Sequence, residues 1–181
     1  MSAIQPLFPR RPVPALECET VGGDPWRLSD QAPEHFTMVV FYRGLHCPIC
    51  SAYLKQLHEL LPDFSKRGVE VVAVSSDEAE RATRTKAEWG LPNLTIGFGL
   101  DLVKAREWGL YVSTSRGMSS TGVVEPDRFS EPGLYLVRAD GTLYFGTVQT
   151  MPFARPDFRT LLGAVGWVID NDYPARGEVL D

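Results

Sequence analysis

Runs of apolar residues alternate with segments of helical periodicity along most of this chain. Continuous β-branched and aromatic runs are typical of buried strands, and they lie at Thr37–Tyr42, Val69–Val74 and Leu94–Phe98. Apolar positions three and four residues apart predict amphipathic helices between and after these strands. We expect these helices from Cys47 to Gly68, from about Glu78 to Trp89, from about Asp101 to Trp108 and from Arg155 to Asn171.

Turn residues mark two hairpins. The sequence Gly22-Gly23-Asp24-Pro25 separates two short strand candidates and predicts a hairpin at a sheet edge, formed by Ala15–Thr20 and Trp26–Leu28. The dipeptide Asp140-Gly141 predicts a second hairpin, formed by Leu134–Val137 and Thr142–Val148.

The segment from Tyr111 to Ser130 is rich in Ser, Thr and Gly and shows no period. We therefore expect a long loop there. Long loops inside compact domains are uncommon and often functional, so this one is a candidate cover for an active site.

Strands that alternate with helices and then give way to a hairpin predict the α/β class, with helices on both faces of a mixed sheet. The chain has 181 residues, of which 44% are hydrophobic, and this is enough for one full core. We expect residues 15–181 to form a single domain. Residues 1–14 are rich in proline and are expected to form an extended arm on its surface.

Composition excludes several functional classes. The net charge is -5 and the basic residues are scattered, which gives no support for nucleic-acid binding. No stretch is long enough to cross a membrane. The N-terminal segment lacks the apolar core of an export signal, so we expect a cytoplasmic protein. In that reducing compartment a cysteine pair is more often catalytic or metal-binding than a structural disulfide.

The sequence Cys47-Pro48-Ile49-Cys50 follows the first buried strand and opens the first long helix. Residues three apart on a helix share one face, so the two thiols are expected to lie close enough for a disulfide. Pro48 fits the first turn, where its missing N–H costs nothing. A thiolate at a helix N-terminus is stabilised, and in such motifs the thiol pKa falls from about 8.5 to roughly 3.5–7.5. The motif predicts a redox centre.

Two basic residues precede the motif. Arg43 and His46 are candidates for positive charge beside the thiolate, although Arg43 could equally pair with a carboxylate at the sheet edge and His46 could occupy an exposed loop. Arg116, in the predicted loop, is a weaker candidate for binding an anionic substrate. Ser75, Ser76 and Asp77 are interpreted as caps of the helix that follows them.

The remaining cysteine and the other histidines offer little for a metal. Cys18 is most simply a small buried residue on a strand. A zinc site needs four ligands, and beyond Cys47 and Cys50 only Cys18, His35 and His58 remain, with no second cysteine pair. We therefore expect no metal.

The order and spacing of these segments resemble the alkyl hydroperoxide reductase and thiol-specific antioxidant family, the peroxiredoxin-like branch of the thioredoxin fold. The resemblance rests on Thr37–Gly68 with its two cysteines, Val71–Asp77, Gly90–Pro92, Lys104–Tyr111, and Leu134–Val137 with Asp140-Gly141.

The resemblance implies that Cys47 attacks a peroxide and becomes a sulfenic acid, and that Cys50 resolves it to a disulfide. It implies no metal or flavin cofactor. An external thiol donor, such as a thioredoxin or glutathione system, would reduce the disulfide. The resemblance also allows a homodimer.

Several positions depart from the pattern of that family. Val40 and Gly44 stand where peroxiredoxins usually carry Pro and Thr or Ser. Pro132 takes the place of their arginine, at a position where thioredoxins have a cis-proline, and Phe41 replaces the buried acid of thioredoxins. Three functions therefore stay open: a thiol peroxidase, a thiol–disulfide oxidoreductase that acts on protein or small-molecule disulfides, and a non-enzymatic binding module.

Overall fold

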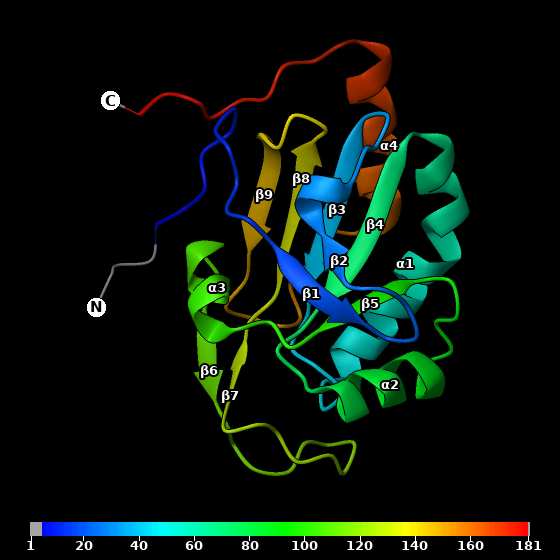
Figure 1. Ribbon diagram of the computed structural model, residues 1–181, viewed down its shortest axis with the longest axis vertical. Coiled ribbons are helices and arrows are strands. Elements are labelled where there is room, and N and C mark those ends of the chain that lie inside the picture. Colours follow the sequence, from blue (N-terminus) through cyan, green and yellow to red (C-terminus); the bar gives the residue numbers. More distant parts are fainter. Residues whose placement is uncertain (1–4, 181) are drawn as a thin grey trace.

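The computed structural model describes residues 5–180 and has a seven-stranded mixed sheet with helices on both faces (Figure 1). The strand order is β2-β1-β5-β4-β3-β8-β9, in which β5, β4 and β3 are parallel neighbours and the other pairs are antiparallel. The strands of this sheet are β1 (Glu17–Thr20), β2 (Trp26–Arg27), β3 (Phe36–Phe41), β4 (Val69–Val74), β5 (Thr95–Phe98), β8 (Gly133–Arg138) and β9 (Leu143–Val148).

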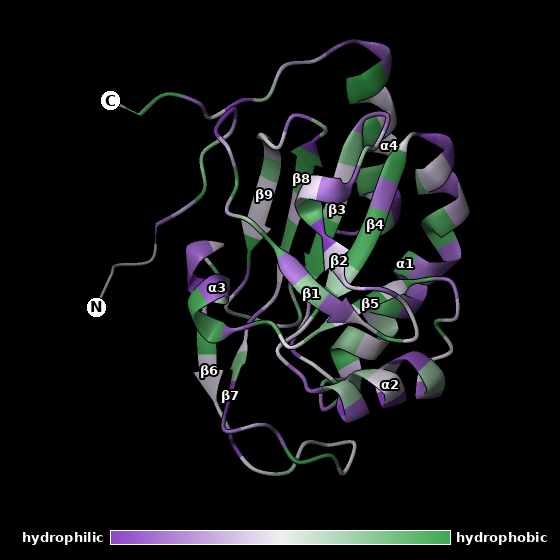
Figure 2. Ribbon diagram, viewed as in Figure 1, coloured by the Kyte–Doolittle hydropathy of each residue, from purple (hydrophilic) through white to green (hydrophobic). Residues whose placement is uncertain are grey.

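Four α-helices surround the sheet, and they are α1 (Pro48–Lys66), α2 (Ala79–Glu88), α3 (Leu102–Glu107) and α4 (Phe158–Asp170). Successive side chains of a strand point to opposite faces, and β3 follows this rule. Met38 and Val40 join the core under α1, α2 and α4, whereas Val39 and Phe41 join the core under α3. The central strands are accordingly apolar along most of their length (Figure 2).

The predicted α/β class and the N-terminal hairpin at the sheet edge are confirmed, because β1 and β2 pair antiparallel at one end of the strand order. The predicted strand and helix positions agree with the structure to within a few residues. The largest difference at a boundary is in α4, which begins at Phe158 and not at Arg155. The Asp157 side chain caps this helix by accepting a hydrogen bond of 2.8 Å from the N–H of Thr160.

The segment from Tyr111 to Ser130 is not the continuous loop expected from its composition. It contains β6 (Val112–Thr114) and β7 (Arg128–Ser130), which pair antiparallel as a separate two-stranded sheet. Strands of three residues are too short to show an alternation of apolar and polar positions. We call residues 112–130 the β6–β7 hairpin.

Residues of the N-terminal arm lie against the turn between β8 and β9. The Arg10 N–H donates to the Leu143 carbonyl at 2.8 Å, and the Val13 N–H donates to the Gly141 carbonyl at 3.0 Å. Residues 1–4 of the predicted arm lie outside the described residues. No helix in residues 5–180 is long and apolar enough to cross a membrane.

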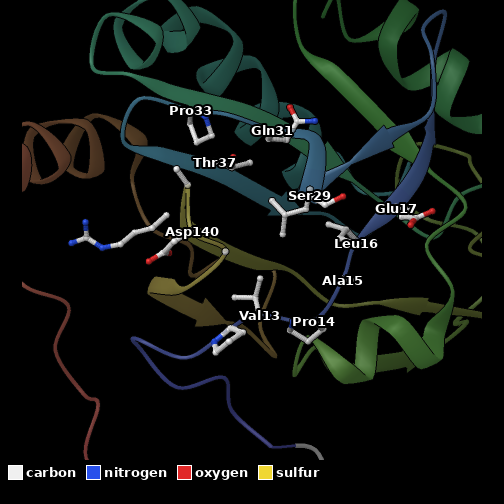
Figure 3. A pocket seen from close by; sticks show the side chains of 15 residues that line it. Val13, Pro14, Ala15, Leu16, Glu17, Ser29, Gln31, Pro33, Thr37 and Asp140 are labelled. Atoms are coloured by element: carbon white, nitrogen blue, oxygen red, sulfur yellow. The ribbon is translucent and has the colours of Figure 1, made fainter.

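A cleft of about 370 Å³ lies between this arm and the sheet (Figure 3). Its lining includes Val13 and Pro14 of the arm, Thr37 of β3 and Asp140 of the turn between β8 and β9. Thr37 is at the start of β3, whereas Cys47 follows the end of that strand. The cleft is therefore remote from the cysteine motif.

Candidate active site

Cys47 is the N-cap residue of α1. Its backbone is extended (φ -100, ψ 104), and its Sγ accepts a hydrogen bond of 3.3 Å from the backbone N–H of Cys50. Pro48 occupies the first helical position, as predicted. The first N–H groups of a helix carry partial positive charge and lack intrahelical partners, so this position stabilises a thiolate.

The pKa values of the two thiols are shifted in opposite directions. A hydrogen bond from the Cys50 thiol lowers the pKa of Cys47 to about 6, against the effect of burial and with help from the Cys50 N–H, Arg155 and Arg43. Burial and the neighbouring Cys47 thiolate raise the pKa of Cys50 well above its ordinary value. At neutral pH the site therefore holds a thiolate on Cys47 and a thiol on Cys50.

Arg155 contacts both sulfurs. Its Nη2 lies 3.2 Å from the Cys50 Sγ and 3.8 Å from the Cys47 Sγ. Its Nη1 is buried and has no hydrogen-bond partner among the described residues. The guanidinium therefore supplies positive charge beside both sulfurs, a role that the sequence did not indicate, and it leaves one donor available beside the dithiol.

Local contacts hold Arg155 in this position. Its Nε donates to the Pro152 carbonyl at 2.8 Å, and its guanidinium lies over the Tyr53 ring, 5.1 Å from the centroid. The Tyr53 hydroxyl in turn donates to the Pro156 carbonyl at 2.7 Å. A groove of about 420 Å³, lined by residues that include Tyr53, Phe153 and Arg155, opens at this side of the dithiol.

The loop between β3 and α1 is fastened from the other side by Asp77. Its buried carboxylate accepts a hydrogen bond of 2.7 Å from the Leu45 N–H and one of 2.8 Å from Arg81 Nε. This role differs from the predicted one, because the N-cap of α2 is Glu78 and neither Ser75 nor Asp77 caps that helix. Ser75 instead accepts a hydrogen bond from the Asp77 N–H at 3.2 Å.

His46 does not provide positive charge. It is buried, and its ring lies 4.6 Å from the Phe129 ring centroid. Burial, together with the charges of Arg43 and Arg81, lowers the pKa of His46 to about 4, so the imidazole is neutral at physiological pH. Neither alternative for His46 matches the structure, because the ring is buried and not exposed, and burial favours its neutral form.

Arg43 forms ion pairs with two carboxylates. It lies 3.4 Å from Glu131 and 3.8 Å from Glu125, and its guanidinium stacks over Phe129 at 4.7 Å. Both alternatives for this residue thus apply, since it forms ion pairs and also lowers the pKa of Cys47.

Three further candidates from the sequence are Pro132, Arg116 and Cys18. Pro132 is buried directly before β8 and follows a trans peptide bond, so the cis-proline of thioredoxins is not reproduced. Arg116 is exposed in the β6–β7 hairpin. Cys18 is buried on β1 against Gly97, and burial raises its pKa to about 12.

In residues 5–180, no three His, Cys, Asp or Glu side chains are grouped to hold a metal ion.

Together the fold and the site define a protein of the thioredoxin-like class, with a pair of cysteines at the N-terminus of α1. A model of the AhpC/TSA family matches residues 9–145. The chain belongs to that family, and the resemblance inferred from the motifs is confirmed.

Known proteins agree with this assignment. A 1-Cys peroxiredoxin of Onchocerca volvulus is 24% identical over 135 residues, which are 68% of this chain and 52% of that protein. The chain thus spans about half the length of this curated relative.

Solved structures share the fold at low sequence identity. Peroxidoxin BcpB of Mycobacterium tuberculosis has a TM-score of 0.69 at 15% identity, with coverage of 90% of this chain and 98% of that chain. Reduced 2-Cys peroxiredoxin of Plasmodium vivax has a TM-score of 0.71 at 16% identity, with coverage of 92% and 86%. These likenesses establish a peroxiredoxin-type thioredoxin fold.

Proposed function

We propose that this protein is a thiol peroxidase in which Cys47 is the attacking thiolate and Cys50 the resolving thiol. One observation carries the proposal: the Cys47 Sγ caps α1 by accepting the Cys50 N–H at 3.3 Å, with Arg155 in contact with both sulfurs. The Cys50 N–H and the Arg155 guanidinium favour the ionised sulfur, which is the nucleophilic form.

In the first step the Cys47 thiolate attacks one oxygen of the hydroperoxide. A sulfur–oxygen bond forms, the O–O bond breaks, and the leaving alkoxide or hydroxide takes up a proton to become an alcohol or water. Cys47 is oxidised to a sulfenic acid. The unpartnered Nη1 of Arg155 is a donor that can stabilise the negative charge on the leaving oxygen.

In the second step Cys50 loses its proton and its sulfur attacks the Cys47 sulfenic acid. The sulfur–sulfur bond forms as the S–O bond breaks, and the hydroxyl leaves as water. An external thiol reductant, for example a thioredoxin or glutathione system, then supplies the two electrons that restore the dithiol. Position supports Cys50 in this role, because its N–H already contacts the Cys47 sulfur.

Thiol–disulfide exchange on another protein is the second candidate. A Cys-x-x-Cys pair at a helix N-terminus favours it. The burial of the sulfurs weighs against a bulky substrate, since Cys47 is 1% exposed and Cys50 is 0% exposed. A hydroperoxide with two reacting oxygens needs much less room than a folded disulfide protein.

Rapid-mixing kinetics test the proposal. Reduced protein is mixed with hydrogen peroxide, cumene hydroperoxide or an oxidised protein substrate. Consumption of the substrate is measured for the wild type and for Cys47→Ser, and formation of the Cys47–Cys50 disulfide in the wild type is followed by mass. We expect the wild-type protein to react with peroxide at least a hundred times faster than free cysteine does. We expect Cys47→Ser to abolish this reaction. A rate equal to that of free cysteine would refute peroxidase activity, and undiminished activity in Cys47→Ser would refute both redox functions.

A further inference from the structure

The β6–β7 hairpin packs against the loop that leads into the cysteine motif. Phe129 is fully buried, and its ring contacts the His46 ring directly before Cys47 and the Arg43 guanidinium. Val123 packs against the core that contains Cys47 and Cys50. In Figure 1 the loop between β6 and β7 runs beside α2 at the end of the molecule where α1 begins.

Few contacts hold the outer part of this hairpin against the motif. Arg43 lies 3.8 Å from Glu125, and Arg81 Nη1 donates to the Val124 carbonyl at 3.1 Å. The Arg43 and Glu125 side chains are only 17% and 10% exposed, so water screens this ion pair less than a surface pair. Glu125 also accepts a hydrogen bond of 2.7 Å from the Arg116 N–H, which closes the loop on itself.

The second carboxylate near Arg43 belongs to the base of the hairpin. Glu131 is buried beside β7, and its Oε1 accepts a hydrogen bond of 2.5 Å from the Ser113 hydroxyl. Its ion pair with Arg43 therefore does not depend on where the outer loop lies. Removing Glu125 would release the loop and still leave Arg43 with a paired carboxylate.

We propose that Glu125 is a specificity-determining residue: through Arg43 it holds the β6–β7 hairpin over Cys47, so that small hydroperoxides reach the sulfur and protein disulfides do not. This inference rests on the proposed peroxidase function and names what limits its substrates. Exchange with a protein disulfide requires the Cys47 thiolate to form a bond to one substrate sulfur while the other leaves as a thiolate, and access decides whether that occurs.

Alkylation of Cys47 tests the cover without relying on any activity. Reduced Cys50→Ser protein, with and without Glu125→Ala, is treated with iodoacetamide and with a 5 kDa polyethylene-glycol maleimide, and modification of Cys47 is followed by mass. We expect Glu125→Ala to raise the ratio of the large-reagent rate to the small-reagent rate about five-fold, which corresponds to about 1 kcal/mol. The matched control is Asp127→Ala, an exposed acid of the same hairpin whose side chain makes no ion pair with a described residue; the ratio should not change.

Activity assays on the same substitutions in the wild-type dithiol complete the test. We expect Glu125→Ala to raise the rate of protein-disulfide reduction relative to peroxide reduction by a similar factor. An unchanged alkylation ratio in folded Glu125→Ala protein would overturn the inference. Absence of peroxide reduction in the wild type would instead refute the proposed function, and the alkylation ratio would still report whether the hairpin covers Cys47.

Discussion

The Asp77 carboxylate accepts a hydrogen bond of 2.7 Å from the backbone N–H of Leu45, two residues before the Cys47 thiolate. This bond joins the end of β4 to the loop that enters α1. Asp77 is fully buried, and its second oxygen is paired with Arg81. The geometry of the loop that leads into the cysteine motif therefore depends on a residue thirty-two positions after Leu45 in the chain.

Gly44 is predicted to be essential for that loop. Its φ is +129, and a Cβ atom there would lie 2.6–2.8 Å from the Asp77 carboxylate. We expect Gly44→Ala to lower the free energy of unfolding by about 2–4 kcal/mol, because strained backbone and steric conflict combine. Chemical denaturation of the reduced protein measures this loss.

Gly90→Ala is the matched control for this change. Gly90 also has a positive φ, +66, but a Cβ there would meet no atom within 4 Å. A cost of about 1 kcal/mol is expected from the backbone alone. Equal losses in the two variants would contradict a specific conflict with Asp77.

Arg155→Met is predicted to raise the pKa of Cys47. The change removes a cation 3.8 Å from the Cys47 Sγ and keeps a side chain of similar length. Because a positive charge favours the thiolate, we expect an increase of about one pKa unit, or about 1.4 kcal/mol. The pH dependence of iodoacetamide alkylation gives the pKa of Cys47. Because Arg155→Lys retains the positive charge, the Cys47 pKa in this variant should lie between those of the wild type and of Arg155→Met. An unaltered pKa in Arg155→Met would exclude this electrostatic role.

Substitutions of Cys50 separate its effect on the pKa of Cys47 from its proposed role in resolving the Cys47 sulfenic acid. The Cys50 thiol donates the hydrogen bond that lowers the pKa of Cys47 most. Since serine retains a donor and alanine does not, the Cys47 pKa should be higher in Cys50→Ala than in Cys50→Ser. After one equivalent of peroxide, dimedone should trap a sulfenic acid in both variants. Rapid loss of that species in either variant would remove Cys50 from the resolving role.

The reactivity of Cys47 should follow its pKa of about 6. The thiolate fraction increases with pH, so the alkylation rate should be half-maximal near pH 6 and level above about pH 7. Cys18→Ala should leave this profile unaltered, because that thiol is buried and its pKa is raised to about 12. A midpoint at the ordinary thiol value would show that the site does not stabilise the thiolate.

Periodicity was sufficient to predict the class of fold and most of its elements. The apolar runs of β3 and β4 and the spacing of apolar residues in α1 depend on local packing, and local packing is visible in sequence. The position of Cys47 and Cys50 at the start of α1 also follows from local rules, because a proline at the first helical position is a clear signal.

The partners of the cysteines could not be predicted in this way. Arg155 is 105 residues from Cys50, at the start of the predicted last helix, and nothing in its neighbourhood indicates a contact with sulfur. Asp77 resembled a helix cap because acids are common before helices. The sequence left open whether His46 is charged or exposed, and only the three-dimensional position of Phe129 reveals that the ring is enclosed.

The opposite pKa shifts of Cys47 and Cys50 determine how the midpoint potential of their dithiol–disulfide couple depends on pH. Above about pH 6 the reduced pair retains a single proton, because Cys47 is ionised and Cys50 is not. Disulfide formation then releases two electrons but only one proton. The midpoint potential should fall by roughly 30 mV per pH unit, half the slope of a pair of ordinary protonated thiols. A change in the acidity of the surroundings would thus alter the reducing power of this dithiol only half as much.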